Sequence, residues 1–244
     1  MITDIVGLNI SSFEIIQTIA LTSFAGFTSF LGIYMAKKIN FSQRAVLALT
    51  SFGAGILIAA AIFEMVVEAE KLIGLLVTII AFISGAILFA FLDWLAEKKG
   101  GGAGILLGMG MDSIPESLAI GAAVGSMGSA AALAFLIGIQ NVTEGVASFH
   151  EMKESNSPLN KIKNIFIATV IISIIPIIMG LVGLFFMKGM DTPIGIILAL
   201  SSGGIFYMLH FDMIPKAHKE KEWLTTFGAI LGFIIGFGVS IGVG

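Results

Sequence analysis

The sequence contains no cysteine, few charged residues and only three histidines among its 244 residues. Without cysteine the chain has no disulfide, no thiolate metal ligand and no cysteine nucleophile. Charged residues make up 12% of the chain and form no basic run, so nothing in it indicates a nucleic-acid partner. No lysine or arginine precedes Lys37, so the N-terminus lacks the basic segment of a signal peptide and we expect it to be retained.

Hydrophobic residues dominate the chain instead. They make up 57% of the residues, and the mean hydropathy of +1.04 lies outside the range of ordinary soluble domains. Apolar segments of about 20 residues, enough to cross a hydrocarbon core, occur eight times. They run approximately from Phe13 to Met35, Ala45 to Glu68, Leu72 to Leu95, Gly104 to Val124, Ala130 to Phe149, Ile165 to Met187, Pro193 to Ile214, and Trp223 to Val243. The sequence therefore predicts an all-α integral membrane protein with eight transmembrane helices, in which residues 1–244 form one polytopic domain.

Lysine and arginine residues predict how these spans are oriented. If the N-terminus lies outside the cytoplasm, the loops after spans one, three, five and seven contain 11 of the 13 basic residues. Only Lys71 and Lys188 fall on the other side. Because basic residues accumulate in cytoplasmic loops, we expect a multi-pass protein of the plasma (inner) membrane with both termini outside the cytoplasm.

An internal similarity links spans two and seven. Residues 63–69 (FEMVVEA) resemble residues 211–217 (FDMIPKA) at an offset of 148, which also pairs Gly55 with Gly203. Since span two runs outward and span seven inward, we expect spans one to three and six to eight to be inverted repeats around spans four and five, an arrangement typical of transporters. Chance similarity between two hydrophobic helices is the alternative, because glycine and phenylalanine recur often here.

Spans four and five each contain an unusual polar motif, DSIPES starting at Asp112 and QNVTEG starting at Gln140. Within each motif the first residue and a glutamate, Glu116 or Glu144, stand at i and i+4 on one helix face. Carboxylates inside a membrane span are costly and usually face a cavity or a bound cation. The repeated motif therefore predicts an ion site, whereas a single polar residue of this kind fits an interhelical hydrogen bond equally well.

The carboxylates of these motifs, Asp112, Glu116 and Glu144, cannot all stay ionised in a low dielectric unless cations or protons neutralise them. A divalent cation meets this need, and protonation on its release makes proton-linked transport a natural hypothesis. Oxygen ligands favour Mn(II), Mg(II) or Fe(II). Pro115 removes one backbone donor, so we expect span four to bend one turn before Glu116.

Four further polar residues lie toward the ends of spans two and seven. Glu64 and Glu68 are candidates for an outer vestibule, and Asp212 with His210 for an inner exit. Interfacial or paired charges at helix ends are the alternative interpretation of these residues. The pair His150–Glu151 is expected to begin a solvated cytoplasmic loop.

The motifs of spans four and five resemble the variants of His-Asn-x-Pro-Glu-Gly found in the ZIP family of divalent metal transporters (Zrt- and Irt-like proteins). The glycine-rich stretches at 51–69 and 201–215, each leading to an acidic residue, also look like patterns of this family. The resemblance covers nearly the whole chain and implies eight spans with both termini outside. It also implies a homodimer and an elevator-like movement of the metal-bearing spans against a static scaffold.

The resemblance implies a set of metal ligands as well. Asp112, Glu116, Gln140 and Glu144 match ligands of the family's principal metal site. Ser113 and Asn141, with the bridging glutamates, match the neighbouring second site that some members possess.

The chain departs from the family pattern at several positions. Asp112 and Gln140 stand where histidine is common, Ser113 replaces asparagine, and Thr143 replaces proline. In span six, Ile175 stands where the family often has a glutamate, so the second site has one carboxylate fewer.

These observations favour a transporter that moves a divalent metal such as zinc, iron or manganese into the cytoplasm, with the ion as substrate and no cofactor. The alternatives are a similar protein with a remodelled site that moves another cation or exports, and a membrane protein that binds metal without transporting it. An intramembrane enzyme is disfavoured, because Asp112 and Asp212 lack the local patterns of a protease and no Ser-His or Cys-His pair lies within the spans.

Overall fold

The computed structural model describes residues 10–98, 101–126, 130–154, 161–187, 190–217 and 223–243, and these residues form helices and no strand. The helices are α1 (Ser12–Lys38), α2 (Gln43–Ala59), η1 (Ala60–Val66), α3 (Val67–Ile73), α4 (Leu75–Glu97), α5 (Gly101–Ser126), α6 (Ala130–Glu154), α7 (Ile162–Ile172), α8 (Ile175–Met187), α9 (Asp191–Met208), η3 (Leu209–Met213), α10 (Ile214–Ala217) and α11 (Trp223–Val243). The prediction of an all-α protein is confirmed.

Each predicted span corresponds to one helix or to a run of consecutive helices. Span two is α2, η1 and α3 in succession, span six is α7 and α8, and span seven is α9, η3 and α10. Seven helical stretches of the described residues are long and apolar enough to cross a membrane. The remaining span, α5, is 26 residues long. The chain is therefore a multi-pass helical protein built for a bilayer.

The helix ends follow from local sequence chemistry. Ser11 and Glu14 form a capping box at the start of α1, with 2.8 Å from the Ser11 amide to the Glu14 carboxylate. The Ser42 hydroxyl accepts a bond from the Ala45 amide and begins α2. Gly74, the residue between α3 and α4, has φ of 74° and ψ of 160°, a backbone conformation that is essentially restricted to glycine.

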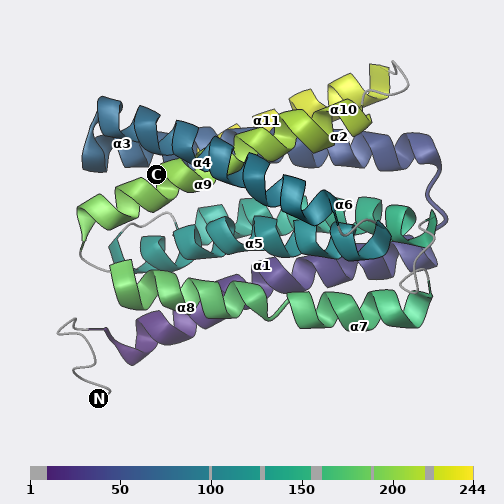
Figure 1. Ribbon diagram of the computed structural model, residues 1–244, viewed down its shortest axis with the longest axis horizontal. Coiled ribbons are helices and arrows are strands. Elements are labelled where there is room, and N and C mark those ends of the chain that lie inside the picture. The colour runs from purple at the N-terminus through teal and green to yellow at the C-terminus, as the bar shows by residue number, and fades with distance from the viewer. Residues whose placement is uncertain are drawn as a thin grey trace.

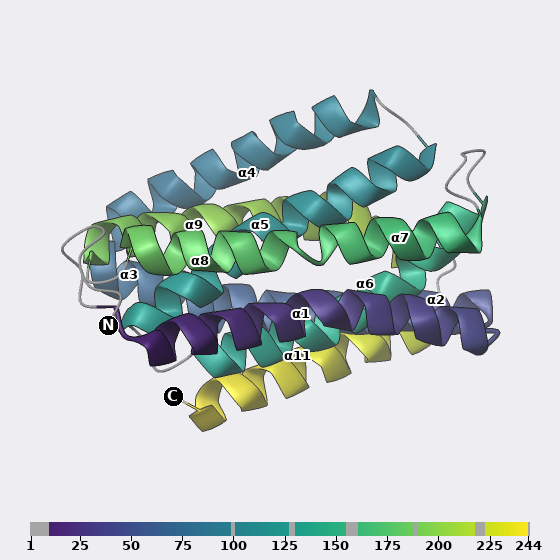
Figure 2. The ribbon, with the colours of Figure 1, turned by 90° about the horizontal axis from the view of Figure 1, so that it is seen from below.

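The helices form two bundles that lie side by side (Figure 1). One bundle, here the α5/α6 bundle, contains α1, α5, α6, α7 and α8. The other, here the α2/α9 bundle, contains the spans of α2 and α9 together with α4 and α11. The bundles meet where α2 packs on α6 and where α5 packs on α9. α1 begins and α11 ends at the same end of the molecule, as an even number of crossings requires (Figures 1 and 2).

Glycines allow the paired helices to approach closely. A Cβ atom at Gly145 of α6 would collide with the carbonyl of Ser29 on α1, and one at Gly121 of α5 would collide with the carbonyl of Gly180 on α8. In the other bundle, Gly55 of α2 meets the Ala229 carbonyl of α11. Close backbone packing through small residues holds helices together in lipid, where the hydrophobic effect does not drive helices to associate.

Three irregularities interrupt the regular helices. Span six is broken at residues 173–174, because Pro176 carries no backbone N–H, and the Ser173 hydroxyl donates there to the carbonyls of Thr169 (2.9 Å) and Gly26 (3.0 Å). Spans two and seven each contain a π-helical segment, η1 and η3. By contrast, α5 is assigned as one helix through Pro115. Neither the break nor the π-helices were expected from the sequence.

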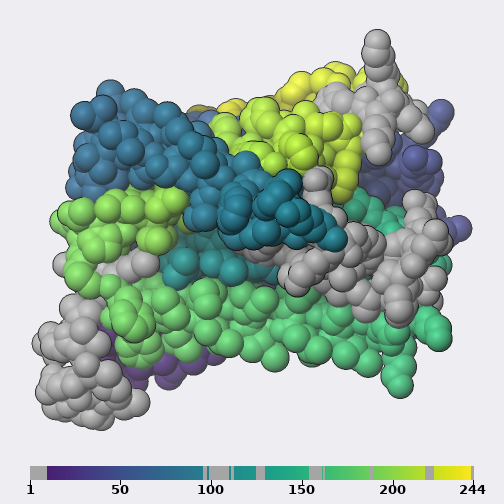
Figure 3. Space-filling model, in the orientation of Figure 1, coloured from purple at the N-terminus to yellow at the C-terminus, as the bar shows by residue number. Residues whose placement is uncertain are grey.

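The outward face of α4 is apolar. Helix α4 lies across one face, over α9 and α5, and exposes large aliphatic and aromatic side chains (Figure 3). Leu75, Leu76, Ile80, Ile83, Ile87 and Phe91 are each more than half exposed on this helix. A soluble domain does not expose such a continuous apolar face, so this surface fits contact with lipid chains.

Candidate functional site

The two central motifs meet where α5 packs against α6, at the interface between the bundles. Glu116 on α5 is 2% exposed, and Glu144 on α6 is partly buried. Their carboxyl groups lie close enough for the charge on Glu144 to act on Glu116. Two carboxyl groups from different spans therefore stand on packed helices within electrostatic reach of each other.

Gln140 adds a third polar side chain, an amide, to these two carboxyl groups. Its Nε2 atom donates to a Glu144 carboxylate oxygen over 3.3 Å, which fixes the direction of the amide. The other end of the amide, Oε1, is buried and has no hydrogen-bond partner among the described residues. An unsatisfied buried acceptor is rare in proteins and costs about 1–3 kcal/mol. A cation beside the carboxylates would satisfy it.

Neighbouring polar residues hold α6 in position. Asn141 is 4% exposed, and its Nδ2 atom donates over 2.8 Å to the carbonyl of Ala25 on α1. Thr143 donates to the Gln140 carbonyl over 2.7 Å and lies directly against Gly53 of α2. The Asn141 amide nitrogen therefore links α6 to α1, which leaves only its oxygen as a potential metal ligand.

The remaining motif residues are only partly described. Asp112 lies on α5, but its side chain is outside the part of the chain whose side chains the structure describes. Ser113 is partly exposed and has an interaction partner. Among the described side chains, no group of three or more aspartate, glutamate or histidine residues forms a metal-binding cluster. The described part of the site is thus Glu116, Glu144 and Gln140.

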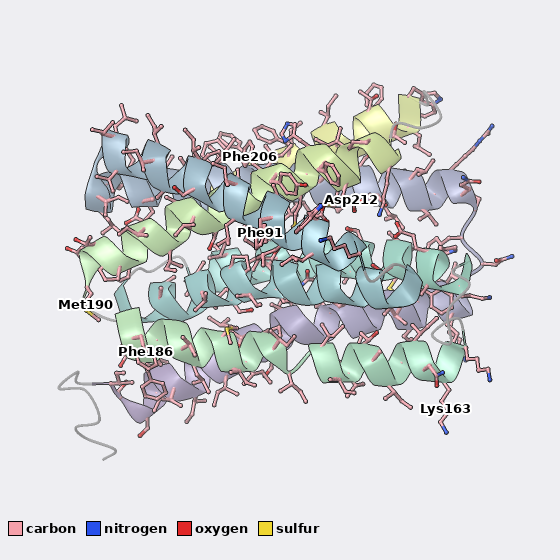
Figure 4. All side chains as sticks on the ribbon, in the orientation of Figure 1. Phe91, Lys163, Phe186, Met190, Phe206 and Asp212 are labelled. Carbon is pink, nitrogen blue, oxygen red and sulfur yellow. The ribbon has the colours of Figure 1, made fainter. Side chains whose placement is uncertain are left out.

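The four residues expected to form a vestibule and an exit lie on two different spans. Glu64 is 5% exposed and lies on η1, while Glu68 pairs with Lys71 at 2.9 Å. On span seven, Asp212 of η3 is exposed and lies on the half of the span that leads to α10 (Figure 4). His210 is exposed and stacks on Phe206, with 5.8 Å between ring centroids.

The structure corrects one expectation and adds a charged contact that the sequence did not reveal. His150 and Glu151 do not begin a loop, because α6 continues to Glu154. Glu151 instead pairs with Lys216 of α10 at 3.0 Å, and Lys216 also pairs with Asp212 at 2.8 Å. The spacing of Glu151 seven residues after Glu144, two turns along the same face, was the available signal.

Two serines of span seven form buried hydrogen bonds that the sequence analysis did not single out. Ser201 bonds to the other bundle, and Ser202 bonds within its own bundle. Ser201 is 3% exposed and donates over 3.3 Å to the Pro115 carbonyl, one residue before Glu116. Ser202 is fully buried and donates over 2.7 Å to the Leu198 carbonyl and over 3.4 Å to that of Ala61, within η1. Both lie in the small-residue run of residues 201–204, which could have indicated a close helix crossing.

No protein-family model matches the chain, and no curated protein matches it. The fold and the site define its class: a multi-pass helical membrane protein with one buried and one partly buried carboxyl group near the interface of two helix bundles.

Proposed function

We propose that the protein transports a divalent metal cation across the membrane, with Glu116, Glu144 and Gln140 as the described part of its binding site. The observation that carries this proposal is the buried Gln140 oxygen, which has no hydrogen-bond partner among the described residues and belongs to a side chain bonded to the Glu144 carboxylate. Asp112, one turn before Glu116 on α5, is proposed as a further ligand.

Electrostatics supports a cation as the occupant. An ionised carboxylate that leaves water without a partner costs several kcal/mol, and two close carboxylates add mutual repulsion. Neutralisation requires either a cation or protons, and these two states are the loaded and unloaded forms of a cation carrier. We propose that loading releases protons from this site, which couples metal movement to proton movement.

The ligand chemistry sets the expected metals. The described donors are two carboxylates and one amide oxygen, with no imidazole or thiolate among them. Such donors suit Mn(II), Mg(II) and Fe(II), and zinc also accepts carboxylates. We therefore propose manganese or iron as the first candidates, with zinc next.

The arrangement of the helices supports inverted repeats. The sequence offset of 148 that pairs Glu64 with Asp212 also aligns the two π-helical segments. It aligns η1 (Ala60–Val66) with residues 208–214, the range that contains η3. The packing pairs match too: α2 on α11 corresponds to α4 on α9, and α1 on α6 corresponds to α8 on α5. We propose that the α5/α6 bundle carries the cation and moves against the α2/α9 bundle, as in transporters built from such repeats.

The positions of basic residues support an orientation with both termini outside. One end of the bundle bears the residues Lys37, Lys38, Arg44, Lys98, Lys153, Lys161, Lys163 and Lys216. The other end bears Lys71 among the described residues. We propose that the basic end faces the cytoplasm. An epitope at the N-terminus, tested for antibody binding on intact cells, checks this orientation.

Uptake into proteoliposomes tests the transport proposal. The vesicles contain the wild type, Glu116→Gln or Glu144→Gln and are offered Mn(II), Fe(II), Zn(II), Cd(II) and Mg(II) at two external pH values. Each glutamine keeps the size of the side chain and removes its charge. Flux of at least one ion in the wild type, with a loss of about tenfold or more in both variants, is expected.

Glu70→Gln is the matched control, because Glu70 is exposed on α3 and belongs to neither the site nor the candidate vestibule. It should keep the wild-type flux within about twofold, since single charges at the surface contribute little. Wild-type vesicles that accumulate none of these ions would refute transport. Undiminished flux in both glutamine variants would refute the site.

A further inference from the structure

Lys216 forms a charged contact that joins the two bundles. Its ammonium group lies 3.0 Å from Oε1 of Glu151 on α6 and 2.8 Å from Oδ1 of Asp212 on η3. Asp212 and Lys216 belong to the same span, four residues apart, so their contact remains whatever the bundles do. Glu151 belongs to the α5/α6 bundle, so its contact crosses the interface.

The contact lies on the same side of the molecule as the proposed exit. Glu151 follows Glu144 by two turns of α6, and Glu151, Asp212 and Lys216 are near enough to act electrostatically on Glu144. Residues around it are packed across the interface, since Leu49 of α2 lies against a buried cluster that includes Phe149 and Met152 of α6. The ion pair therefore reinforces an apolar contact between the bundles at this end.

We propose that the Lys216–Glu151 ion pair is a latch that holds the two bundles in the arrangement seen here. The inference rests on the proposed movement of one bundle against the other. When the α5/α6 bundle moves, Glu151 leaves Lys216, and Asp212 keeps the ammonium group paired within its own span. Because Asp212 limits the cost of opening, the latch biases the arrangement without locking it.

The size of the bias follows from the exposure of the pair. The side chains of Lys216 and Glu151 are each 37% exposed, so water screens their attraction. Ion pairs of this exposure should shift the equilibrium between the arrangement seen here and the moved arrangement by about two- to fivefold. A latch of that strength is suited to a carrier that has to open repeatedly.

Thiol labelling tests the latch directly, because the chain has no cysteine of its own. Leu49→Cys introduces a single thiol on α2 at the packed interface. The full-length protein in liposomes, without metal, is treated with a maleimide, and the rate of modification is measured. The rate should rise about two- to fivefold when Glu151→Gln or Lys216→Met is added.

Two matched variants separate the latch from general loosening. Lys216→Arg keeps the charge and should label at the rate of Leu49→Cys alone within about 1.5-fold, whereas Asp212→Asn leaves Lys216 unpaired once the bundles part and should label no faster than Leu49→Cys alone. An unchanged rate in Glu151→Gln, or an equal rise in Asp212→Asn, would overturn the latch. Since no metal is present, a labelling response without metal flux would refute transport alone, and flux without a labelling response would refute the latch alone.

Discussion

Gly145 offers a sharp test of how the site is held in place. It follows Glu144 on α6, and a Cβ atom there would collide with the backbone carbonyl of Ser29 and crowd the amide of Ile33 on α1. Both obstacles are backbone atoms, which cannot rotate away as a side chain can. Gly145→Ala therefore forces α6 and α1 apart at the residue next to a proposed ligand.

The expected magnitude combines two opposing effects. Overpacking of a closely packed contact costs about 1–3 kcal/mol. Replacing a glycine within a helix by alanine contributes about 0.5–1 kcal/mol of stability. Because the collision is with backbone, the cost should lie in the upper part of its range, which leaves a net loss of about 1–2 kcal/mol for Gly145→Ala.

Gly238 of α11 provides the matched control. A Cβ atom at this position meets nothing within 4 Å, so Gly238→Ala should raise stability by about 0.5–1 kcal/mol through the helix effect alone. Unfolding of both variants and of the wild type in the same detergent measures the difference. Gly145→Ala should also reduce metal flux. Equal stability of the two variants would show that the α1 and α6 backbones are not packed as closely as described.

Two more outcomes are expected. Gly74→Ala should destabilise the protein by about 1–3 kcal/mol, because φ of 74° is strained for alanine even though no atom lies within 4 Å of the added Cβ. An unfolding midpoint equal to that of the wild type would refute this account of the α3–α4 turn. A transported metal at about 100 times its dissociation constant should stabilise the wild type by about 2.7 kcal/mol and Glu116→Gln far less, and an equal rise in the unfolding midpoint of both would remove Glu116 from the site.

The sequence was sufficient to predict the spans, because crossing a bilayer depends on local properties. A span satisfies its backbone groups mainly within its own helix and needs about 20 apolar residues, so the runs from Phe13 to Val243 could be recognised one by one. The i, i+4 motifs could be recognised in the same way, since helix periodicity alone puts Gln140 beside Glu144. The homodimer and the preferred metal stay predictions.

Other features could not be predicted because they depend on which helices become neighbours. The carbonyl of Ala25 accepts a bond from Asn141, 116 residues away, and no local pattern contains that pairing. The polarity of His150 and Glu151 indicated a loop, but α6 continues through both residues to Glu154. The break at residues 173–174 had a local signal in Pro176, yet the packing of Gly26 against that proline is tertiary.

The sequence by itself determined that this chain crosses a membrane repeatedly and carries carboxylates within its spans, since hydropathy and helix periodicity are local properties of the sequence. Only the tertiary structure decided that Glu116 and Glu144 come within electrostatic reach of each other, that the Gln140 oxygen has no partner among the described residues, and that Lys216 reaches across to Glu151. The physical reason is that these relations depend on the crossing of helices whose contacts are made by small residues and backbone atoms. Such contacts leave little trace in composition or spacing.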